Sequence, residues 1–352
     1  MIKFLTQKLF YGTLVLFGVI FIVFFLFNIL PVDPARLTLG QRADVESVEA
    51  INKELGLDKP KSVQFLMYLN DVLPLSVYKN EPKILEKYKG ISLVKLPKYV
   101  LLLKKPYLRR SYQTKREVWQ ILTQALPQTI ILAISSILLA SIIGIVLGTI
   151  AALRQHTWFD NAAMTLSVMG ISVPSYFSAL VLGYFFGIVW YKWTGLDQTG
   201  GLFIIDDFGN EVFALKNLIL PTLALGTRPI GTIFQLTRSS MLEVLSQDYI
   251  RTAKAKGLST TVVIFKHALR NALNPVITTI SGWFASLLAG AFFVEVIFDI
   301  KGLGYTAVDA LMKFDFPVVM GSVLFTASIF IIVNILVDIL YAILDPRIKL
   351  GK

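Results

Sequence analysis

Long runs of apolar residues, bounded by charged positions, recur along the whole chain. A helix that crosses the hydrocarbon core of a bilayer needs about 20 such residues. Five runs reach this length, namely residues 9–32, 118–153, 161–191, 271–294 and 316–337. A sixth run, residues 217–237, carries Arg228 near its centre, where a charge costs about 2.5–3.5 kcal/mol on insertion scales. The pattern predicts an all-α fold, a polytopic membrane bundle of six transmembrane helices.

The charges of the loops predict their orientation, because loops on the cytoplasmic side carry an excess of Lys and Arg. Residues 238–270 hold six basic and two acidic side chains, whereas residues 192–216 and 295–315 each hold two basic and four acidic ones. With six spans, this bias places the amino and carboxyl termini in the cytoplasm. The first run exceeds the about 7–15 apolar residues of a cleavable signal sequence, so we expect a permanent anchor.

We expect one transmembrane domain, residues 1–352, because no fixed repeat and no Ser- or Gly-rich linker divides the chain. The six-span topology places residues 31–116 outside, where we predict that they form a cap. Their basic charge does not oppose this placement, because charge does not decide the side of loops longer than about 60 residues. Helical spacing within the cap covers residues 45–55 and 61–73. Five prolines in or beside the apolar runs are expected to kink or end helices. They are Pro127, Pro174, Pro221, Pro229 and Pro275.

Composition agrees with a membrane protein, since 55% of the residues are hydrophobic, 16% are charged and the mean hydropathy is +0.66. Most of the net charge of +11 comes from residues 31–116, which hold 17 basic and 9 acidic side chains. This segment contains no recognisable nucleic-acid module. We therefore expect contact with membrane lipid and not with nucleic acid. The lack of Cys excludes a disulfide framework and a thiolate metal site.

No catalytic motif is found in the chain. A phosphate-cradling G-x-x-x-x-G-K-[ST] loop, an H-E-x-x-H pair and a G-x-S-x-G elbow are all missing, and His156 and His267 are the only histidines. We predict that the chain is not an enzyme by itself, and that it has no catalytic, cofactor-binding or metal-binding residue.

Residues 238–275 contain a pattern of two helices joined by a turn. Helical spacing and the absence of Gly and Pro predict one helix over residues 239–256, which Gly257 ends in the left-handed conformation. Ser259 is placed to cap a second helix, residues 260–272, that ends before Pro275. Three apolar residues are expected to be buried along one stripe of this second helix, namely Val262, Phe265 and Leu269.

Two interpretations fit this basic segment. Its side chains Arg251, Lys254 and Lys256 are placed to reach an acidic partner, and its small residues, Ala253, Ala255 and Gly257 among them, let another backbone approach closely. Alternatively, it is an ordinary basic loop close to anionic lipid.

The string LTRSSMLEVLSQDYIRTAKAKGLSTTVVIFKHALRNALNPVI, residues 236–277, resembles the conserved loop of ABC importer permeases of the oligopeptide, dipeptide and nickel branch. Other stretches resemble landmarks of the same branch over nearly the whole chain. They include FNILPVDPA from residue 27, LGLDKP from residue 55, ISVPSYF from residue 171 and FFVEVIFDIKGLGYTAVDA from residue 292. Two departures are a basic insertion at about residues 75–105 and the pair Arg228-Pro229.

The resemblance implies a permease subunit that forms half of a peptide pathway across the cytoplasmic membrane. It implies a homologous second permease, two ATP-binding subunits that use ATP and Mg²⁺, and an extracytoplasmic substrate-binding protein. It also implies that the loop at residues 238–275 docks the ATP-binding subunits. The expected docking residues are Glu243, Asp248, Tyr249, Ile250, Arg251, Thr252, Ala253, Lys254, Ala255, Lys256 and Gly257.

Some alternatives stay open at this point. Arg228 either faces the pathway and meets a substrate carboxylate, or pairs with Asp338 or a carbonyl. The cargo is a peptide, a nickel chelate or another small solute, since similar permeases carry all of these. An ion-coupled secondary transporter is a different class, which predicts internal inverted repeats and midspan carboxylates. Asp338 is a thin candidate for such a carboxylate.

Overall fold

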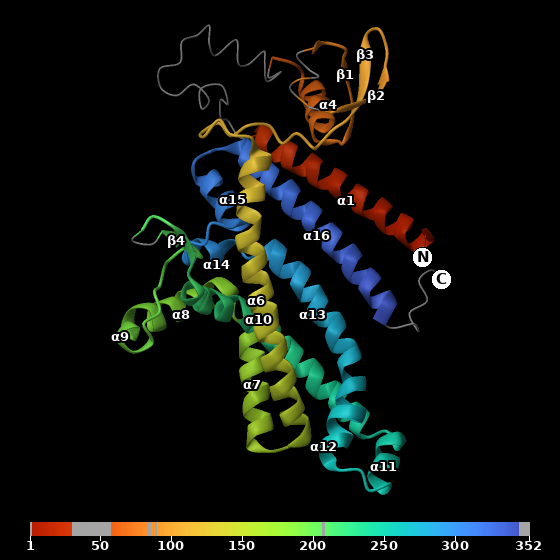
Figure 1. Cartoon of the computed structure of the whole chain (residues 1–352), viewed down its shortest axis with the longest axis vertical. Coiled ribbons are helices and arrows are strands. Elements are labelled where there is room, and N and C mark those ends of the chain that lie inside the picture. The colour runs from red at the N-terminus through yellow and green to blue at the C-terminus, as the bar shows by residue number, and fades with distance from the viewer. Residues whose placement is uncertain are drawn as a thin grey trace. The chain divides into compact units, whose positions relative to one another are not determined.

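A computed structural model of the chain describes residues 2–29, 58–82, 86, 88, 90–205 and 208–344 (Figure 1). The chain divides into two compact units, and each is described by itself. Unit 1 comprises Met1–Lys8, Leu126–Tyr305 and Ile329–Lys352, and unit 2 comprises Leu9–Ala125 and Thr306–Ser328. The predicted cap helix at residues 45–55 lies outside the described residues.

Long apolar helices confirm a multi-pass membrane protein. Among the described residues, four stretches are long and apolar enough to cross a bilayer, and a bent pair of helices makes up to five. The four are Thr6–Phe27, Val118–Leu153, Thr260–Ala289 and Phe316–Ile339. They belong to α1 (Ile2–Ile29), α6 (Val118–Leu153), the stretch that ends in α13 (Arg270–Gly290), and α16 (Phe316–Leu344).

The third predicted run folds as the bent pair. Helix α7 (Trp158–Ser172) ends at Val173, α8 (Ser175–Tyr184) starts after Pro174 and continues as the π-helix η1 (Phe185–Val189), and the two halves meet at 107°. Val173 has the extended conformation that a following proline imposes. The predicted break at Pro174 is confirmed. The short helix α9 (Tyr191–Thr194) follows and ends at Gly195, whose φ is +59°.

Helix α10 (Leu215–Leu245) contains the sixth predicted run and is the central helix of unit 1. It packs against α7, α8 and α13, and glycines allow its close approach to α7 and to α6. A Cβ built on Gly231 would lie 2.5 Å from the carbonyl oxygen of Ser167, and one on Gly148 would lie 2.7 Å from that of Phe234. Small residues of this kind bring helices together in membranes, where burial from water supplies little attraction between them.

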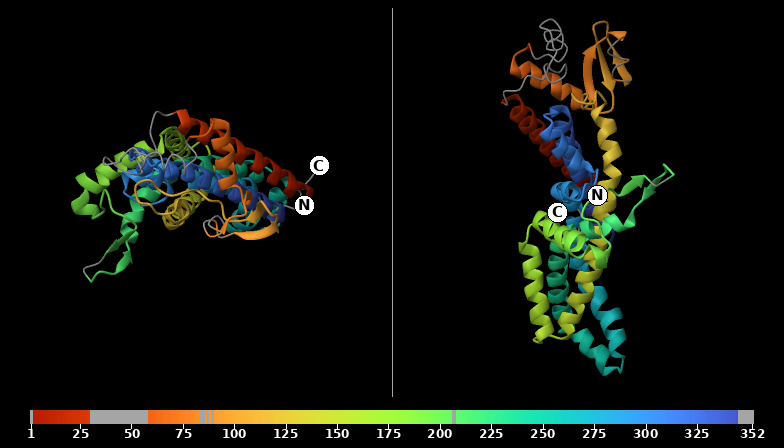
Figure 2. Two further views of the ribbon diagram at one scale, coloured as in Figure 1. Left: turned by 90° about the horizontal axis from the view of Figure 1, so that it is seen from above. Right: turned by 90° about the vertical axis from the view of Figure 1, so that its left-hand side faces the viewer.

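Two small antiparallel sheets correct the all-α prediction. In unit 1, β4 (Phe203–Ile205) and β5 (Glu211–Phe213) form a hairpin that stands away from the helices (Figure 2). In unit 2, β3 (Tyr99–Leu103) pairs on either side with β1 (Leu75–Lys79) and β2 (Ile91–Lys95). The basic insertion at residues 75–105 therefore folds as a sheet. The helix predicted at residues 61–73 is confirmed as α4 (Lys61–Val72).

The sheet of the insertion is held by a buried polar cluster around Asp71. One carboxylate oxygen of Asp71 accepts hydrogen bonds from Tyr78 Oη at 3.2 Å and from Tyr88 Oη at 2.8 Å. The two tyrosine rings stack with their centroids 4.3 Å apart. Lys104, only 6% exposed, donates to the carbonyl oxygen of Asp71. Burial lowers the pKa of Lys104 to about 8. Its Nζ atom lies 5.7 Å from the centroid of the Tyr78 ring and 5.2 Å from that of the Tyr88 ring, an arrangement that is favourable for a cation.

A second buried carboxylate organises the chain between α14 (Phe292–Ile297) and α15 (Leu303–Met312). Glu295 is fully buried and accepts hydrogen bonds from Thr129 Oγ1 at 2.7 Å and from the backbone N–H groups of Gly304 and Tyr305. Those N–H groups belong to the first turn of α15, where a negative charge is favourable. Burial nevertheless raises the pKa of Glu295 to about 7, against the lowering effect of these hydrogen bonds.

We expect stability to depend on pH through Glu295. Its pKa rises from an ordinary 4.5 to about 7 on folding, so the folded protein holds the proton more tightly and stability is lost as pH rises through this window. At about 1.4 kcal/mol per pH unit, the loss is about 3 kcal/mol. Thermal unfolding of the detergent-solubilised protein at several pH values measures it. The Glu295→Gln variant removes this titration, and an unchanged pH dependence in the variant would contradict the assignment.

Adding a methyl group where α10 crosses α7 is predicted to destabilise the protein. Gly231→Ala forces the two helices apart, because its Cβ meets the Ser167 carbonyl oxygen, and overpacking of this kind costs about 1–3 kcal/mol. The matched control is Gly282→Ala in α13, where a Cβ meets no atom within 4 Å. Thermal unfolding compares the two variants. Equal melting temperatures for both would show that the crossing is not tightly packed.

Candidate coupling site

The predicted two-helix segment is present, but its first helix is broken at a point that the sequence pattern did not predict. Helix α10 ends at Leu245, the backbone of Gln247 is extended, and α11 (Asp248–Ala255) follows. The prediction of one continuous helix over residues 239–256 is therefore wrong. Beyond the break, Ile250 and Ala253 of α11 belong to one buried cluster with Met241 of α10.

Burial divides the expected docking residues into two groups. Ile250 is 0% and Ala253 is 6% exposed, and both pack with Met241 of α10 and with Ala268 and Ala272 beyond the turn. These two residues hold α11 in place and are not available to a partner. The other expected docking residues are exposed, namely Glu243, Asp248, Tyr249, Arg251, Thr252, Lys254, Ala255, Lys256 and Gly257.

The turn at Gly257 is confirmed. Its φ is +77°, in the left-handed region that glycine adopts without strain. A Cβ at this position would meet no atom within 4 Å, so the requirement for glycine is conformational and not steric. Ser259 occupies the predicted cap position with an extended backbone, but its side chain makes no capping hydrogen bond. Its carbonyl oxygen accepts from Val263 N at 3.0 Å instead.

The second helix differs from its prediction in phase and in length. It starts as α12 (Thr260–Val262), widens into the π-helix η2 (Val263–Leu269) and continues as α13 to Gly290, passing through Pro275. Val262 and Phe265 are exposed, while Val263 and Ala268 are buried. Each turn of a π-helix holds an extra residue, so the buried stripe is displaced from the positions that a 3.6-residue period predicts.

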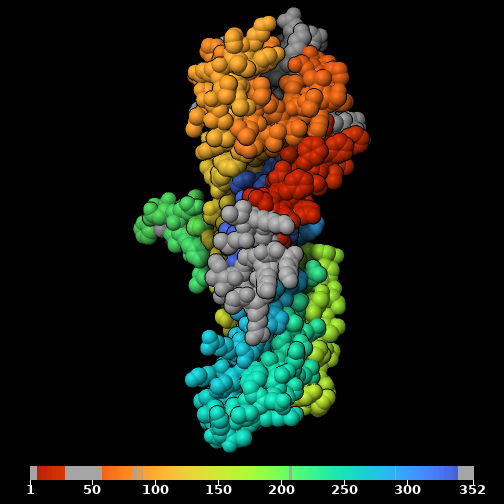
Figure 3. Space-filling view, turned by 90° about the vertical axis from the view of Figure 1, so that its right-hand side faces the viewer, coloured from red at the N-terminus to blue at the C-terminus, as the bar shows by residue number. Residues whose placement is uncertain are grey.

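The exposed side of α11 is basic and is joined to α13 by a hydrogen bond. Arg251 and Lys254 project from the helix, and the side chain of Arg251 is 75% exposed, with Asp248 Oδ1 3.5 Å from its Nη1. Asn271 Nδ2 donates to Tyr249 Oη at 3.0 Å. In Figure 3, the segment from α11 to η2 forms the teal surface at the lower end of the view. The solvent-exposed basic surface of α11 is thus held in place by the apolar contacts of the buried residues of this helix.

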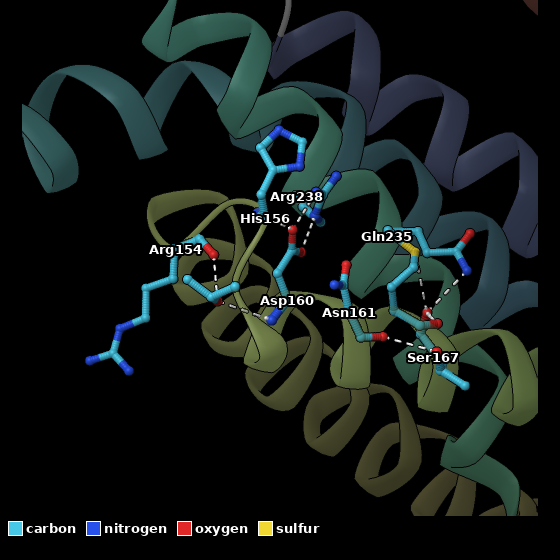
Figure 4. Close-up of polar contacts among 10 residues, drawn as sticks. Arg154, His156, Asp160, Asn161, Ser167, Gln235 and Arg238 are labelled. Atoms are coloured by element: carbon cyan, nitrogen blue, oxygen red, sulfur yellow. Dashed lines mark hydrogen bonds and ion pairs between the residues drawn. The ribbon is translucent and has the colours of Figure 1, made fainter.

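A buried ion pair beside this segment was not predicted. Arg238 of α10 makes two hydrogen bonds to Asp160 of α7, from Nε to Oδ1 at 2.5 Å and from Nη2 to Oδ2 at 2.7 Å (Figure 4). The side chains are 18% and 2% exposed. One turn earlier on α10, Gln235 Nε2 donates to Ser167 Oγ at 3.1 Å. The signal available in the sequence was the position of two opposite charges at the ends of apolar runs.

Arg228 does not pair with Asp338, since Asp338 Oδ2 lies 2.7 Å from Lys8 Nζ. The guanidinium of Arg228 lies over the ring of Trp283, 5.8 Å from its centroid, and the residue is exposed in the described part of the chain. The interaction between a cation and an aromatic face offsets part of the cost of a charge in an apolar helix. The prediction that Arg228 lines a pathway stays untested.

Comparison with known proteins matches this arrangement. Residues 144–350 match the family described as binding-protein-dependent transport system inner membrane component, and residues 1–94 match the amino-terminal part of such components. A dipeptide transport system permease of Alkalihalophilus pseudofirmus is 35% identical, over 95% of this chain and 96% of the relative. A di/tripeptide permease of Pseudomonas aeruginosa is also 35% identical, and a dipeptide permease of Escherichia coli K12 is 33% identical, each over at least 99% of both chains.

The long apolar helices define a multi-pass membrane protein. The chain belongs to the family of binding-protein-dependent transport system inner membrane components, which are permease subunits of ABC importers. The resemblance of the loop at residues 236–277 to such permeases is therefore confirmed. Two solved structures, described as an amino acid ABC transporter with histidines and as the MetNI methionine ABC transporter, are each 14% identical. Their TM-scores are 0.43 and 0.48, and the matches cover 65% and 64% of this chain. The matched regions make up 95% and 97% of those two chains.

Removing the buried anchor of α11 is predicted to free the helix from the rest of unit 1. Ile250→Ala leaves a cavity in the cluster, which costs about 2–5 kcal/mol in a core that does not collapse. We expect trypsin to cleave after Lys254 and Lys256 at least about 30-fold faster, because α11 must detach before it enters the protease. Thr252→Ala, an exposed change on the same helix, is the control. Equal cleavage rates in the two variants would show that Ile250 does not hold α11.

Proposed function

We propose that this chain is the permease subunit of an ATP-driven peptide importer, and that it forms half of the translocation pathway through the cytoplasmic membrane. The relatives named for dipeptide and di/tripeptide transport align with nearly the full length of the chain, which supports peptide as the cargo. The observation that carries the proposal is the exposed basic face of α11, held rigidly by Ile250 and Ala253. Such a face is suited to binding a protein partner whose movement displaces α11.

The proposed topology has six spans, with both termini in the cytoplasm. The bent pair of α7 and α8 makes the third span, and α10 makes the fourth, although Arg228 lowers its hydropathy. Two features support this count. Residues 238–270 carry a net positive charge, whereas residues 192–216 and 295–315 carry a net negative charge, as the orientation requires. In addition, α10 has buried residues from Leu218 to Met241. A helix enclosed by other helices need not be apolar on every face.

The proposed assembly supplies the parts that this chain does not have. A homologous second permease completes the pathway, two ATP-binding subunits hydrolyse ATP with Mg²⁺, and an extracytoplasmic binding protein delivers the cargo. The chain itself is then not an enzyme and holds no cofactor or metal. It contacts membrane lipid and no nucleic acid.

Coupling follows from the packing of α11. When the ATP-binding subunits close on nucleotide, they displace the exposed face of α11. Ile250 and Ala253 share one cluster with Met241 of α10 and with Ala268 and Ala272 of the continuous η2–α13 stretch. A displacement of α11 is therefore passed to two long helices at once. Rigid movement of these helices converts nucleotide closure into alternating access, since a packed cluster moves as one body.

A nickel chelate or another small solute is the second candidate cargo, because permeases of this branch resemble one another even when their cargoes differ. The ion-coupled secondary transporter loses support, since the chain belongs to a family of binding-protein-dependent components and since Asp338 is paired with Lys8. Uptake that persists without ATP hydrolysis and stops when the ion gradient collapses would reinstate it.

Reversing one charge on α11 is predicted to weaken assembly. The ion pair between Arg251 and Asp248 is solvent-exposed and contributes little to stability, so Arg251→Glu leaves the fold intact. It places a negative charge on a basic docking face, and we expect recovery of the ATP-binding subunits by co-purification to fall about tenfold. Lys216→Glu, an exposed change on the predicted external side, is the matched control. Equal recovery with both variants would contradict docking at α11.

A further inference from the structure

The ion pair between Asp160 and Arg238 joins two segments that are 78 residues apart in the sequence. Asp160 lies in the first turn of α7, and its Oδ2 also accepts from the backbone N–H of His156 at 3.0 Å. His156 has a left-handed φ of +63° in the turn between α6 and α7. The carboxylate thus fastens the α6–α7 turn and the start of α7 to one guanidinium of α10, as Figure 4 shows.

The pair lies next to the anchor of α11. Met241 follows Arg238 by one helical turn, about 5 Å along α10, and belongs to the cluster that buries Ile250 and Ala253. Ala152, near the end of α6, is 4% exposed and belongs to the same cluster. The α6–α7 turn therefore meets α10 through an apolar contact at Ala152 and through a charged contact at Asp160.

The apolar contact and the ion pair differ in the movements between helices that they resist. The hydrophobic effect favours apolar contact but has no direction, so it does not by itself select one register between two helices. A guanidinium that makes two hydrogen bonds to a carboxylate has one good geometry. The Asp160 side chain is only 2% exposed, so a displacement leaves its carboxylate shielded from water and without its charged partner. The pair consequently fixes the register of α7 on α10, and the hydrogen bond from Gln235 to Ser167 fixes it again further along.

We propose that the Asp160–Arg238 ion pair transmits the displacement of α11 to the α6–α7 hairpin, so that this hairpin and α10 move as one piece during transport. Both are positioning residues, because each acts through the helix to which the other belongs. The inference rests on the proposed function, because it needs a motor that displaces α11. Without the pair, α10 still moves with α11, and the hairpin is held on α10 only by its close packing and by the hydrogen bond from Gln235 to Ser167, so the movement is passed on less completely.

The test compares cargo uptake with ATP hydrolysis in the full complex, reconstituted in proteoliposomes with its binding protein and a dipeptide. For Asp160→Asn and Arg238→Gln, we expect ATP hydrolysis within about twofold of the unaltered complex and at least about tenfold fewer dipeptides carried per ATP. A purely structural role would lower both activities together, through loss of assembled complex. Lys313→Gln, which breaks an exposed ion pair to Asp309 with an N–O distance of 2.7 Å, is the control with an unchanged ratio.

A second measurement uses the absence of cysteine from this chain. Asp160→Cys together with Arg238→Cys, joined by a short bifunctional thiol reagent, replaces the ion pair with a covalent tie. We expect the joined form to recover the dipeptide-to-ATP ratio and the unjoined form to lack it. Transport that stops on joining, while ATP hydrolysis continues, would show that the hairpin and α10 must slide, and would overturn the inference.

The outcomes separate this inference from the function on which it rests. If the unaltered complex takes up no dipeptide and its rate of ATP hydrolysis does not change when dipeptide is added, the proposed function fails. If the unaltered complex transports and the variants keep its ratio, the inference alone fails. Should the neutral variants not assemble, Arg238→Lys keeps the charge but not the two-bond geometry, and a ratio equal to that of the unaltered complex in this variant would also overturn the inference.

Discussion

The burial of Ile250 and Ala253 is the contact on which the candidate coupling site depends. A helix of eight residues is too short to be stable in water by its own hydrogen bonds. Its order comes from the cluster with Met241, Val263, Ala268 and Ala272. Because that cluster draws on α10 and on the stretch leading into α13, the short helix cannot move without them. The exposed basic face is therefore backed by a rigid support.

Polar contacts add to the close glycine packing that aligns the helices of unit 1. The Asp160–Arg238 pair and the hydrogen bond from Gln235 to Ser167 hold α7 on α10. The fully buried Glu295 holds the first turn of α15. Asp160, Ser167 and Glu295 are buried, and each is satisfied by a named partner. Such groups are costly to separate, which makes them suitable for keeping one arrangement of neighbouring helices.

Much of the fold was predictable, and its exceptions have physical causes. The apolar runs, the break at Pro174 and the left-handed turn at Gly257 follow from hydrophobicity and from local backbone preferences. The sheet of residues 75–105 was missed because its lysines suggested only a charged loop, whereas the aromatic rings that enclose Lys104 become neighbours only on folding. The buried stripe of the second helix was missed because a π-helix changes the period from which burial is inferred.

The sequence by itself determined the membrane class, the approximate spans, the basic segment at residues 238–275 and its resemblance to ABC importer permeases. These rest on composition and on spacing along the chain, which each segment carries alone. Only the tertiary structure decided that α10 breaks after Leu245, that Ile250 faces inward and that Asp160 meets Arg238. Each of these depends on contacts between residues distant in sequence, and local periodicity contains no information on which distant residue supplies the partner.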